Sequence, residues 1–208
     1  MAPIDGRATL DLAYPFTGWW LVQNSPADRV PSHGTTQFAT SYAIDFVPVD
    51  AAGRSARFTA ASLFRTEPPE RFSGFGRLIL APAGGRVIAA HDGEPDHHAH
   101  RGFPSIGYAM TQRMRIAAGW VALAGNHVLL ETAGVVVALC HLQQGSVGVL
   151  PGDIVRAGVP LGRCGNSGNS TEPHVHVQAL SGPDVERATA VPITFRGDLP
   201  HNGTVVEV

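Results

Sequence analysis

The segment Glu172-Pro173-His174-Val175-His176-Val177 is the part of the chain whose residue types point most directly to chemistry. Successive side chains of a β-strand point to opposite faces, so His174 and His176 share one face while Val175 and Val177 face the core. Two imidazoles one strand repeat apart are close enough to share a metal ion or a substrate atom. Two ordinary surface histidines on a half-buried strand would have the same spacing, so this pattern needs partners elsewhere in the chain.

Three further polar residues interrupt or end apolar segments and are candidate partners. Asp45 lies within the apolar run Tyr42–Val47, and a buried carboxylate is costly unless it is paired or bound to a metal. His33 lies on a loop, and His141 follows the apolar run 135–140. An Asp on the wet face of an edge strand and a His at a strand end are the ordinary alternatives. The coincidence of all these residues favours a site.

These residue types suit a catalytic zinc site. Such a site uses three ligands drawn from His, Asp and Glu and leaves one position for water. Two histidines and one aspartate leave the bound cation with a net positive charge, which acidifies the water and polarises a carbonyl oxygen. Further histidines beside the metal can accept the proton or stabilise the oxyanion.

Composition excludes several other classes of protein. All fifteen basic residues are arginine, so lysine chemistry with pyridoxal phosphate, biotin or a phosphate loop is ruled out. A net charge of −2 provides no basic surplus for nucleic acid. No apolar stretch is long enough for a membrane span, and the first residues, Met1–Asp5, lack the basic and apolar regions of a signal peptide.

The elements that must position these residues are mainly β-strands. Gly and Pro together number 40 residues, which suits a turn-rich antiparallel β protein with little helix. Short runs rich in valine, isoleucine and aromatic residues predict strands at 19–23, 42–47, 77–80, 85–89, 128–131, 135–142 and 174–179. Weak helical patterns occupy 60–64 and 106–115, and the longest expected loops are 49–75 and 90–104.

Length and cysteine content predict a single domain over residues 1–208, with a core at about 17–180 and loop insertions near 49–75 and 90–104. Cys140 and Cys164 are too few for a disulfide framework. They are interpreted as two small buried side chains rather than one bridge.

The motifs resemble those of the lysostaphin/LytM-type zinc endopeptidases, which cut peptide cross-links in bacterial cell walls. The resemblance extends through the segments 81–87, 125–128, 140–142, 149–162 and, most specifically, 165–176, with 42–46 as the first metal strand. It implies a mainly antiparallel β-sheet domain (duplicated-hybrid-motif-like) with a substrate groove walled by loops. It also implies an extracytoplasmic location, secreted or in the cell envelope.

By the same resemblance, His33, Asp45 and His176 are the ligands of one Zn²⁺ ion, and His141 and His174 are the catalytic histidines. The implied activity is zinc-dependent hydrolysis of peptide bonds by metal-activated water, with peptidoglycan peptides as substrate. A monomer is the default, with neither nucleic acid nor membrane as partner.

Two points remain open at the level of sequence. The commonest form of the motif places the first His four residues before the Asp, where this chain has Ser41, and His33 lies twelve residues before Asp45. The reserve ligands belong to the loop that is expected to wall the groove: His91, His97, His98 and His100. The alternative function is a catalytically weak or inactive module that binds wall peptides or regulates a partner enzyme.

Overall fold

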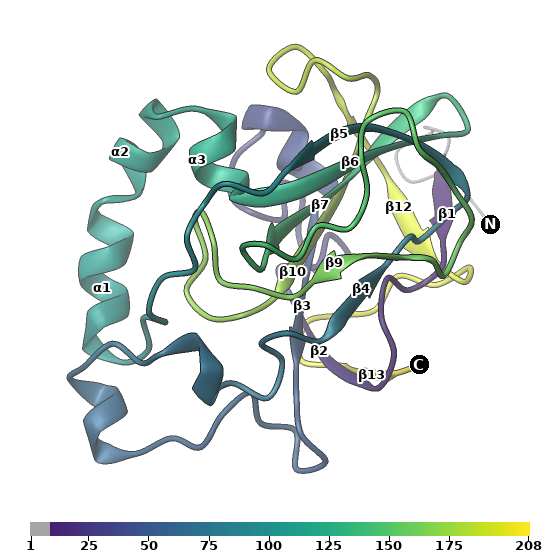
Figure 1. Cartoon of the computed structure of the whole chain (residues 1–208). Coiled ribbons are helices and arrows are strands. Elements are labelled where there is room, and N and C mark those ends of the chain that lie inside the picture. The colour runs from purple at the N-terminus through teal and green to yellow at the C-terminus, as the bar shows by residue number, and fades with distance from the viewer. Residues whose placement is uncertain (1–8) are drawn as a thin grey trace.

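A computed structural model describes residues 9–208, so the expectation for the segment Met1–Asp5 lies outside the described residues. Its main feature is a large, largely antiparallel sheet, shown in Figure 1. In spatial order the strands are β13 (Val205–Glu207), β2 (Trp19–Gln23), β3 (Ile44–Pro48), β10 (Val175–Leu180), β7 (Val135–Leu142), β6 (Asn126–Thr132), β5 (Gly85–His91) and β8 (Ile154–Val155), with β11 (Ala190–Val191) beside β10.

Two small sheets complete the β structure. One is the parallel pair β1 (Leu10–Leu12) and β12 (Ile193–Phe195), and the other is the antiparallel pair β4 (Leu78–Leu80) and β9 (Pro160–Arg163). The prediction of a mainly antiparallel β fold with little helix is therefore confirmed. All seven strands predicted from the sequence are present, with boundaries shifted by a few residues.

The helical segments are short. They are η2 (Gln37–Tyr42), η3 (Ala60–Leu63), η4 (Pro69–Arg71), α1 (Phe103–Met110), α2 (Gln112–Ala117) and α3 (Trp120–Ala124). The three α-helices stack along one side of the sheet, at the left of Figure 1. No helix among the described residues is long and apolar enough to cross a membrane.

Three predicted boundaries were wrong. Tyr42 belongs to the 3-10 helix η2, so the first site strand begins only at Ile44. The predicted helix 106–115 is divided between α1 and α2 at Thr111. The predicted loop 90–104 is shorter, because Ala90 and His91 pair with β6 as the end of strand β5.

The central sheet separates the large apolar core from an opposite face, which carries a smaller apolar cluster on β6 and β7 and polar side chains on β3 and β10. On β10, Val175, Val177 and Ala179 are fully buried in the main core, as the alternation of the sequence predicts. His176 and Gln178 point to the other face. Cys140 and Cys164 are buried and free, which confirms their interpretation as small core residues. We call the part of this opposite face that carries Asp45, His176 and Gln178 the polar face, and a site can form there.

Candidate metal centre and active site

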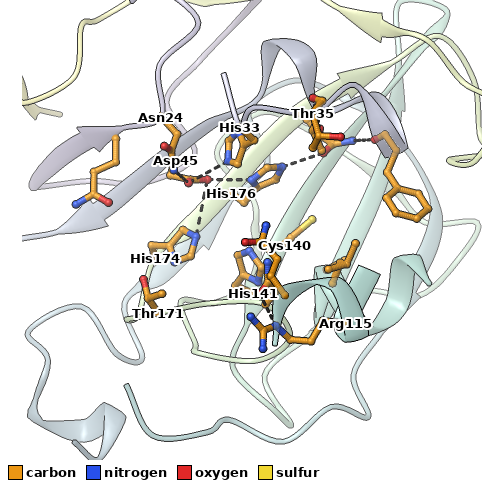
Figure 2. Close-up of a pocket in the computed structure, with 18 of the residues that line it drawn as sticks. Asn24, His33, Thr35, Asp45, Arg115, Cys140, His141, Thr171, His174 and His176 are labelled. Carbon is orange, nitrogen blue, oxygen red and sulfur yellow. Dashed lines mark hydrogen bonds and ion pairs between the residues drawn. The ribbon is translucent and has the colours of Figure 1, made fainter. Parts of the chain in front are cut away.

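The three predicted ligands are brought together at the polar face of the central strands (Figure 2). Asp45 on β3 and His176 on β10 are directly opposite each other in the antiparallel ladder, so their side chains lie on the same face. His176 Nδ1 is 2.9 Å from Asp45 Oδ1. His33 reaches the same carboxylate from its loop, with Nε2 3.1 Å from Asp45 Oδ2.

The surroundings of His33 orient its ring. Ser32 is buried, and its hydroxyl donates to the carbonyl of Thr40 at 3.2 Å. With its proton on that carbonyl, the Ser32 oxygen can accept a hydrogen bond from Nδ1–H of His33, 3.0 Å away. This tautomer leaves the Nε2 lone pair facing Asp45, which is the form that a metal ligand needs. The loop thus compensates for the twelve-residue spacing between His33 and Asp45.

His176 is oriented by Gln178, which sequence reasoning missed. The amide NH₂ of Gln178 donates to the carbonyl of Phe38 at 2.7 Å, so its oxygen faces the ring and accepts from His176 Nε2–H at 2.8 Å. The remaining nitrogen, Nδ1, then presents its lone pair toward Asp45. A signal was present in the sequence, because Gln178 continues the two-residue polar alternation of His174 and His176.

The Asp45 carboxylate is buried but remains charged. Although burial raises its pKa, the neighbouring imidazoles of His33, His174 and His176 hold that pKa well below its usual range. Asn24, a second residue that sequence reasoning missed, donates from its amide to Asp45 Oδ2 at 2.7 Å. An ionised carboxylate among imidazoles is an attractive centre for a cation.

The donor set fits a metal ion. The ligand atoms of His33, Asp45 and His176 all lie within 4.8 Å of one another, and no other such group occurs among residues 9–208. The imidazoles of His33 and His176 each direct one nitrogen at an oxygen of Asp45. A nitrogen lone pair and a carboxylate oxygen repel each other unless a proton or a cation lies between them. Two nitrogens and one carboxylate oxygen are donors that a divalent ion of borderline softness, such as Zn²⁺, accepts.

His141 and His174 lie beside these donors with their outer nitrogens anchored. His141 Nδ1–H donates to the carbonyl of Ser167 at 2.9 Å, and His174 Nδ1–H donates to that of Glu172 at 2.8 Å. Their ring centroids are 4.5 Å apart. Each ring therefore presents Nε2 to the pocket, where it can bind or release a proton. Burial, with the nearby rings of His174 and His176, lowers the pKa of His141 well below its usual value, which keeps that ring neutral.

A break in strand alternation brings His141 to the site. On β7, Val137 and Leu139 pack in the main core while Cys140, on the opposite face, is paired with His176. Strict alternation would place His141 in the apolar core. Its φ of +62° is a left-handed conformation that costs energy in a non-glycine residue. The turned backbone directs the imidazole to the polar face, and Leu142 returns to the core.

A pocket of about 320 Å³ opens over these residues. Its walls come from the loop 23–40, the loop 169–172 and the helical segment 105–124, and we call this last part the helical wall. The expectation that the loop 90–104 walls the groove was wrong, because none of its residues lines this pocket. The loop instead packs behind the site, where Asp96 accepts from the backbone of Asn166 at 2.6 Å.

The reserve ligand candidates take no part in the donor cluster. His91 stacks on His127 at a centroid distance of 5.6 Å. His97 contacts the Gly168 carbonyl through Nε2 at 3.0 Å, and His100 stacks on Tyr108 at 4.3 Å. Nδ1 of His98, the fourth candidate, is 3.3 Å from the hydroxyl of Thr66. Their neighbours make them packing and loop residues.

Residues 105–186 match the family model described as Peptidase family M23. Among solved structures, the chain is similar to lysostaphin from Staphylococcus simulans, with 18% identity over 72% of this chain and 41% of that one, and a TM-score of 0.40. It is similar to the catalytic domain of the same protein, with 15% identity over 86% of both chains and a TM-score of 0.41.

A third similar structure is the M23 metalloprotease pseudoalterin from the deep sea, with 15% identity over 94% of this chain and 84% of that one, and a TM-score of 0.47. The chain spans less than half the length of the full lysostaphin structure that it matches.

Proposed function

We propose that this chain belongs to peptidase family M23, whose model its residues 105–186 match, and that it is a zinc-dependent endopeptidase acting on peptide cross-links of bacterial peptidoglycan. The match agrees with the resemblance drawn from the sequence motifs, and both support a peptidase. The dependence on zinc and the cell-wall substrate belong to the proposal. The observation that carries it is the group of three donor atoms at the floor of a pocket, with two anchored histidines beside it.

In this proposal His33, Asp45 and His176 hold the ion. Their tautomers and charge suit that role, since Ser32 and Gln178 each occupy the far nitrogen of a ligand imidazole. A bound Zn²⁺ supplies Lewis acidity, which lowers the pKa of a coordinated water and polarises a carbonyl. The residues around it supply orientation and proton transfer.

His141 and His174 carry the proton chemistry. Each presents Nε2 to the pocket while a backbone carbonyl holds Nδ1–H. The neutral His141 accepts the proton that is released when water attacks the peptide carbonyl, and it then holds that proton for the leaving amine. His174 lies closer to the carboxylate, with Nε2 3.8 Å from Asp45 Oδ1. In its protonated form it is placed to stabilise developing negative charge on the oxygen.

The test combines metal analysis with hydrolysis. The purified chain is analysed for bound metals and is then incubated with purified cell walls of several cross-link types and with Gly- and Ala-rich peptides. We expect about one zinc per chain, cleavage that chelator abolishes, and recovery when Zn²⁺ is added back. A chain that holds no zinc, or that cleaves none of these substrates, would contradict the proposal.

The alternative, a wall-binding module without useful turnover, is separated by one variant. His141→Ala leaves the three donors in place. If the chain is an enzyme, this variant binds zinc and wall peptides but loses cleavage and any biological effect that depends on it. An effect that persists undiminished in His141→Ala would favour the binding module.

A further inference from the structure

The pocket contains an arginine that forms no ion pair with an acidic side chain among residues 9–208. Arg115 on α2 lines the same pocket as the candidate metal site, from the side of the helical wall. The turn that carries Asn169 connects the two regions. His141 is anchored on the Ser167 carbonyl, and Arg115 Nε donates to Asn169 Oδ1 at 2.6 Å, two residues later in the same turn. Figure 2 shows Arg115 and His141 on this side of the pocket.

The guanidinium is held in one position by neutral partners. Besides Asn169, its terminal nitrogens donate to the hydroxyl of Thr111 at 2.7 Å and to the carbonyl of Tyr108 at 2.6 Å. Its Cζ lies 3.6 Å from the centroid of the Tyr108 ring, and the Tyr108 hydroxyl in turn donates to the Gly168 carbonyl at 3.1 Å. The stacking and the three hydrogen bonds fix the plane of the guanidinium.

These hydrogen bonds leave some N–H groups of Arg115 without an acceptor in the described part of the chain, and its positive charge without a counterion there. A guanidinium has five N–H groups, and three are occupied, one on each nitrogen. Among the described residues, no carboxylate forms an ion pair with Arg115. The two acidic residues of the pocket have other partners: Asp45 contacts the imidazoles, and Glu172 accepts from Ser55 at 2.6 Å. A fixed, partly buried cation with two free donors is suited to a planar anion such as a carboxylate.

We propose that Arg115 binds a carboxylate of the peptide substrate, so that the preferred substrates are peptides with a free carboxylate close to the cleaved bond. This inference rests on the proposed peptidase function and names the substrate class of the same pocket. A chain end and an acidic side chain present the same chemistry to the guanidinium. The second arginine of the pocket, Arg29, is exposed and donates to the Ser32 carbonyl beside His33, so its bonds support the ligand loop.

The test uses three peptides with one Gly- and Ala-rich core. The first has a free C-terminal carboxylate, the second has an amidated end and a glutamate, and the third has an amidated end and a glutamine. Values of kcat/KM are measured for the unchanged chain, Arg115→Gln and Arg115→Lys. The matched control is Arg113→Gln, since Arg113 is exposed on the same helix and does not line the pocket.

We expect the unchanged chain to prefer one or both carboxylate peptides by about 10- to 100-fold, the range of a hydrogen bond to a charged group. Arg115→Gln is expected to reduce this preference to less than about threefold, because kcat/KM falls more for the carboxylate peptides than for the uncharged peptide. Arg115→Lys should retain part of the preference, and Arg113→Gln all of it. Whether the chain end or the glutamate is preferred identifies the source of the carboxylate.

Three results would overturn the inference: equal cleavage of all three peptides by the unchanged chain, an equal loss on all three in Arg115→Gln, or the same loss in Arg113→Gln. Binding of the same peptides to His141→Ala, and to that variant carrying Arg115→Gln, is measured by fluorescence polarisation. If no peptide is cleaved, the proposed function fails, while the polarisation result still decides the role of Arg115. Tighter binding of carboxylate peptides that depends on Arg115 supports it, and equal binding contradicts it.

Discussion

The donor cluster and the helical wall face each other across one pocket but are built on different principles. Asp45 and His176 are buried on adjacent central strands, and the residues that orient the ligand imidazoles, Ser32 and Gln178, are buried as well. The helices α1 and α2 contain no buried residue. They expose large apolar side chains to solvent: Phe103, Ile106, Met110 and Met114.

In the proposed function, this difference separates the residues that carry out the reaction from those that select the substrate. A metal site needs donor atoms placed to within a few tenths of an ångström, which paired strands and locked rotamers supply. A substrate wall needs only to present a few groups at the correct side of the pocket. In the helical wall, Arg115 and Tyr108 are fixed by the turn 167–169, and because α1 and α2 bury no residue, we expect these two helices to contribute little to stability. We therefore expect substitutions in the two regions to have effects of very different size.

Asp45→Asn tests the donor cluster with the largest expected effect. The change removes the charge that two imidazoles and an amide surround, and it presents an NH₂ group where a carboxylate oxygen stood. We expect bound zinc to fall below about one tenth of an equivalent after dialysis and cleavage to fall to background, because a neutral amide is a poor ligand for this ion. Metal analysis and calorimetric titration measure the loss. Asp50→Asn, on an exposed turn outside the pocket, is the control, and retention of metal by Asp45→Asn would rule out its role as a ligand.

His141→Ala is expected to have the next largest effect, and it acts on turnover alone. Removal of the proton acceptor should lower kcat by about 10²- to 10⁴-fold, while the zinc content stays unchanged because His141 is not part of the donor group. Steady-state kinetics and metal analysis on the same sample separate the two. Removal of a left-handed histidine also changes the backbone preference, so a thermal melt must show that the variant is folded. A variant with normal kcat would exclude His141 from proton transfer.

Gln178→Leu has a smaller expected effect and tests whether orientation of His176 is part of the metal site. The leucine removes the acceptor of His176 Nε2–H and leaves the Phe38 carbonyl without its donor. We expect zinc affinity to fall about 10- to 100-fold, the usual cost of losing a partner of a ligand histidine. Gln178→Glu keeps the acceptor and should recover most of the affinity. Equal losses in both variants would indicate a packing role instead.

The sequence predicts the strands well, because they follow from local alternation, and it singles out Asp45 and His176 as polar side chains within apolar strands. Adjacent strands in register then bring two distant residues to one face. The sequence marks His33 as a candidate on a loop, but only the family resemblance implies that it joins Asp45, since its approach depends on a loop that Ser32 and Arg29 hold together. No local sequence pattern indicates that the segment between His33 and Asp45 folds back so that the two side chains meet.

Two features of the site could not be predicted from local sequence patterns. One departs from strand alternation, and the other depends on contacts between distant segments. The left-handed φ of His141 reverses the face on which alternation would place it. The sequence predicts only one weak helix, 106–115, in the helical wall. The helices α1 and α2 bury no residue and have no apolar stripe that faces a core, so hydrophobic periodicity carries little information there. The location of the helical wall is set by contacts with the turn 167–169. One of these is the close backbone approach of Gly125 to Gly168, where neither position has room for a side chain.

Met110→Ser, in the helical wall, is expected to have the smallest effect. Met110 is 81% exposed, so the substitution removes few contacts and should change the free energy of unfolding by less than about 0.5 kcal/mol. The comparison variant is Leu139→Ala on β7, whose fully buried side chain packs in the main core and should cost about 2–5 kcal/mol. Chemical denaturation measures both. A loss above about 2 kcal/mol for Met110→Ser would mean that α1 is covered by further contacts, in which case the wall shares the rigidity of the strands and its separation from the donor cluster is lost.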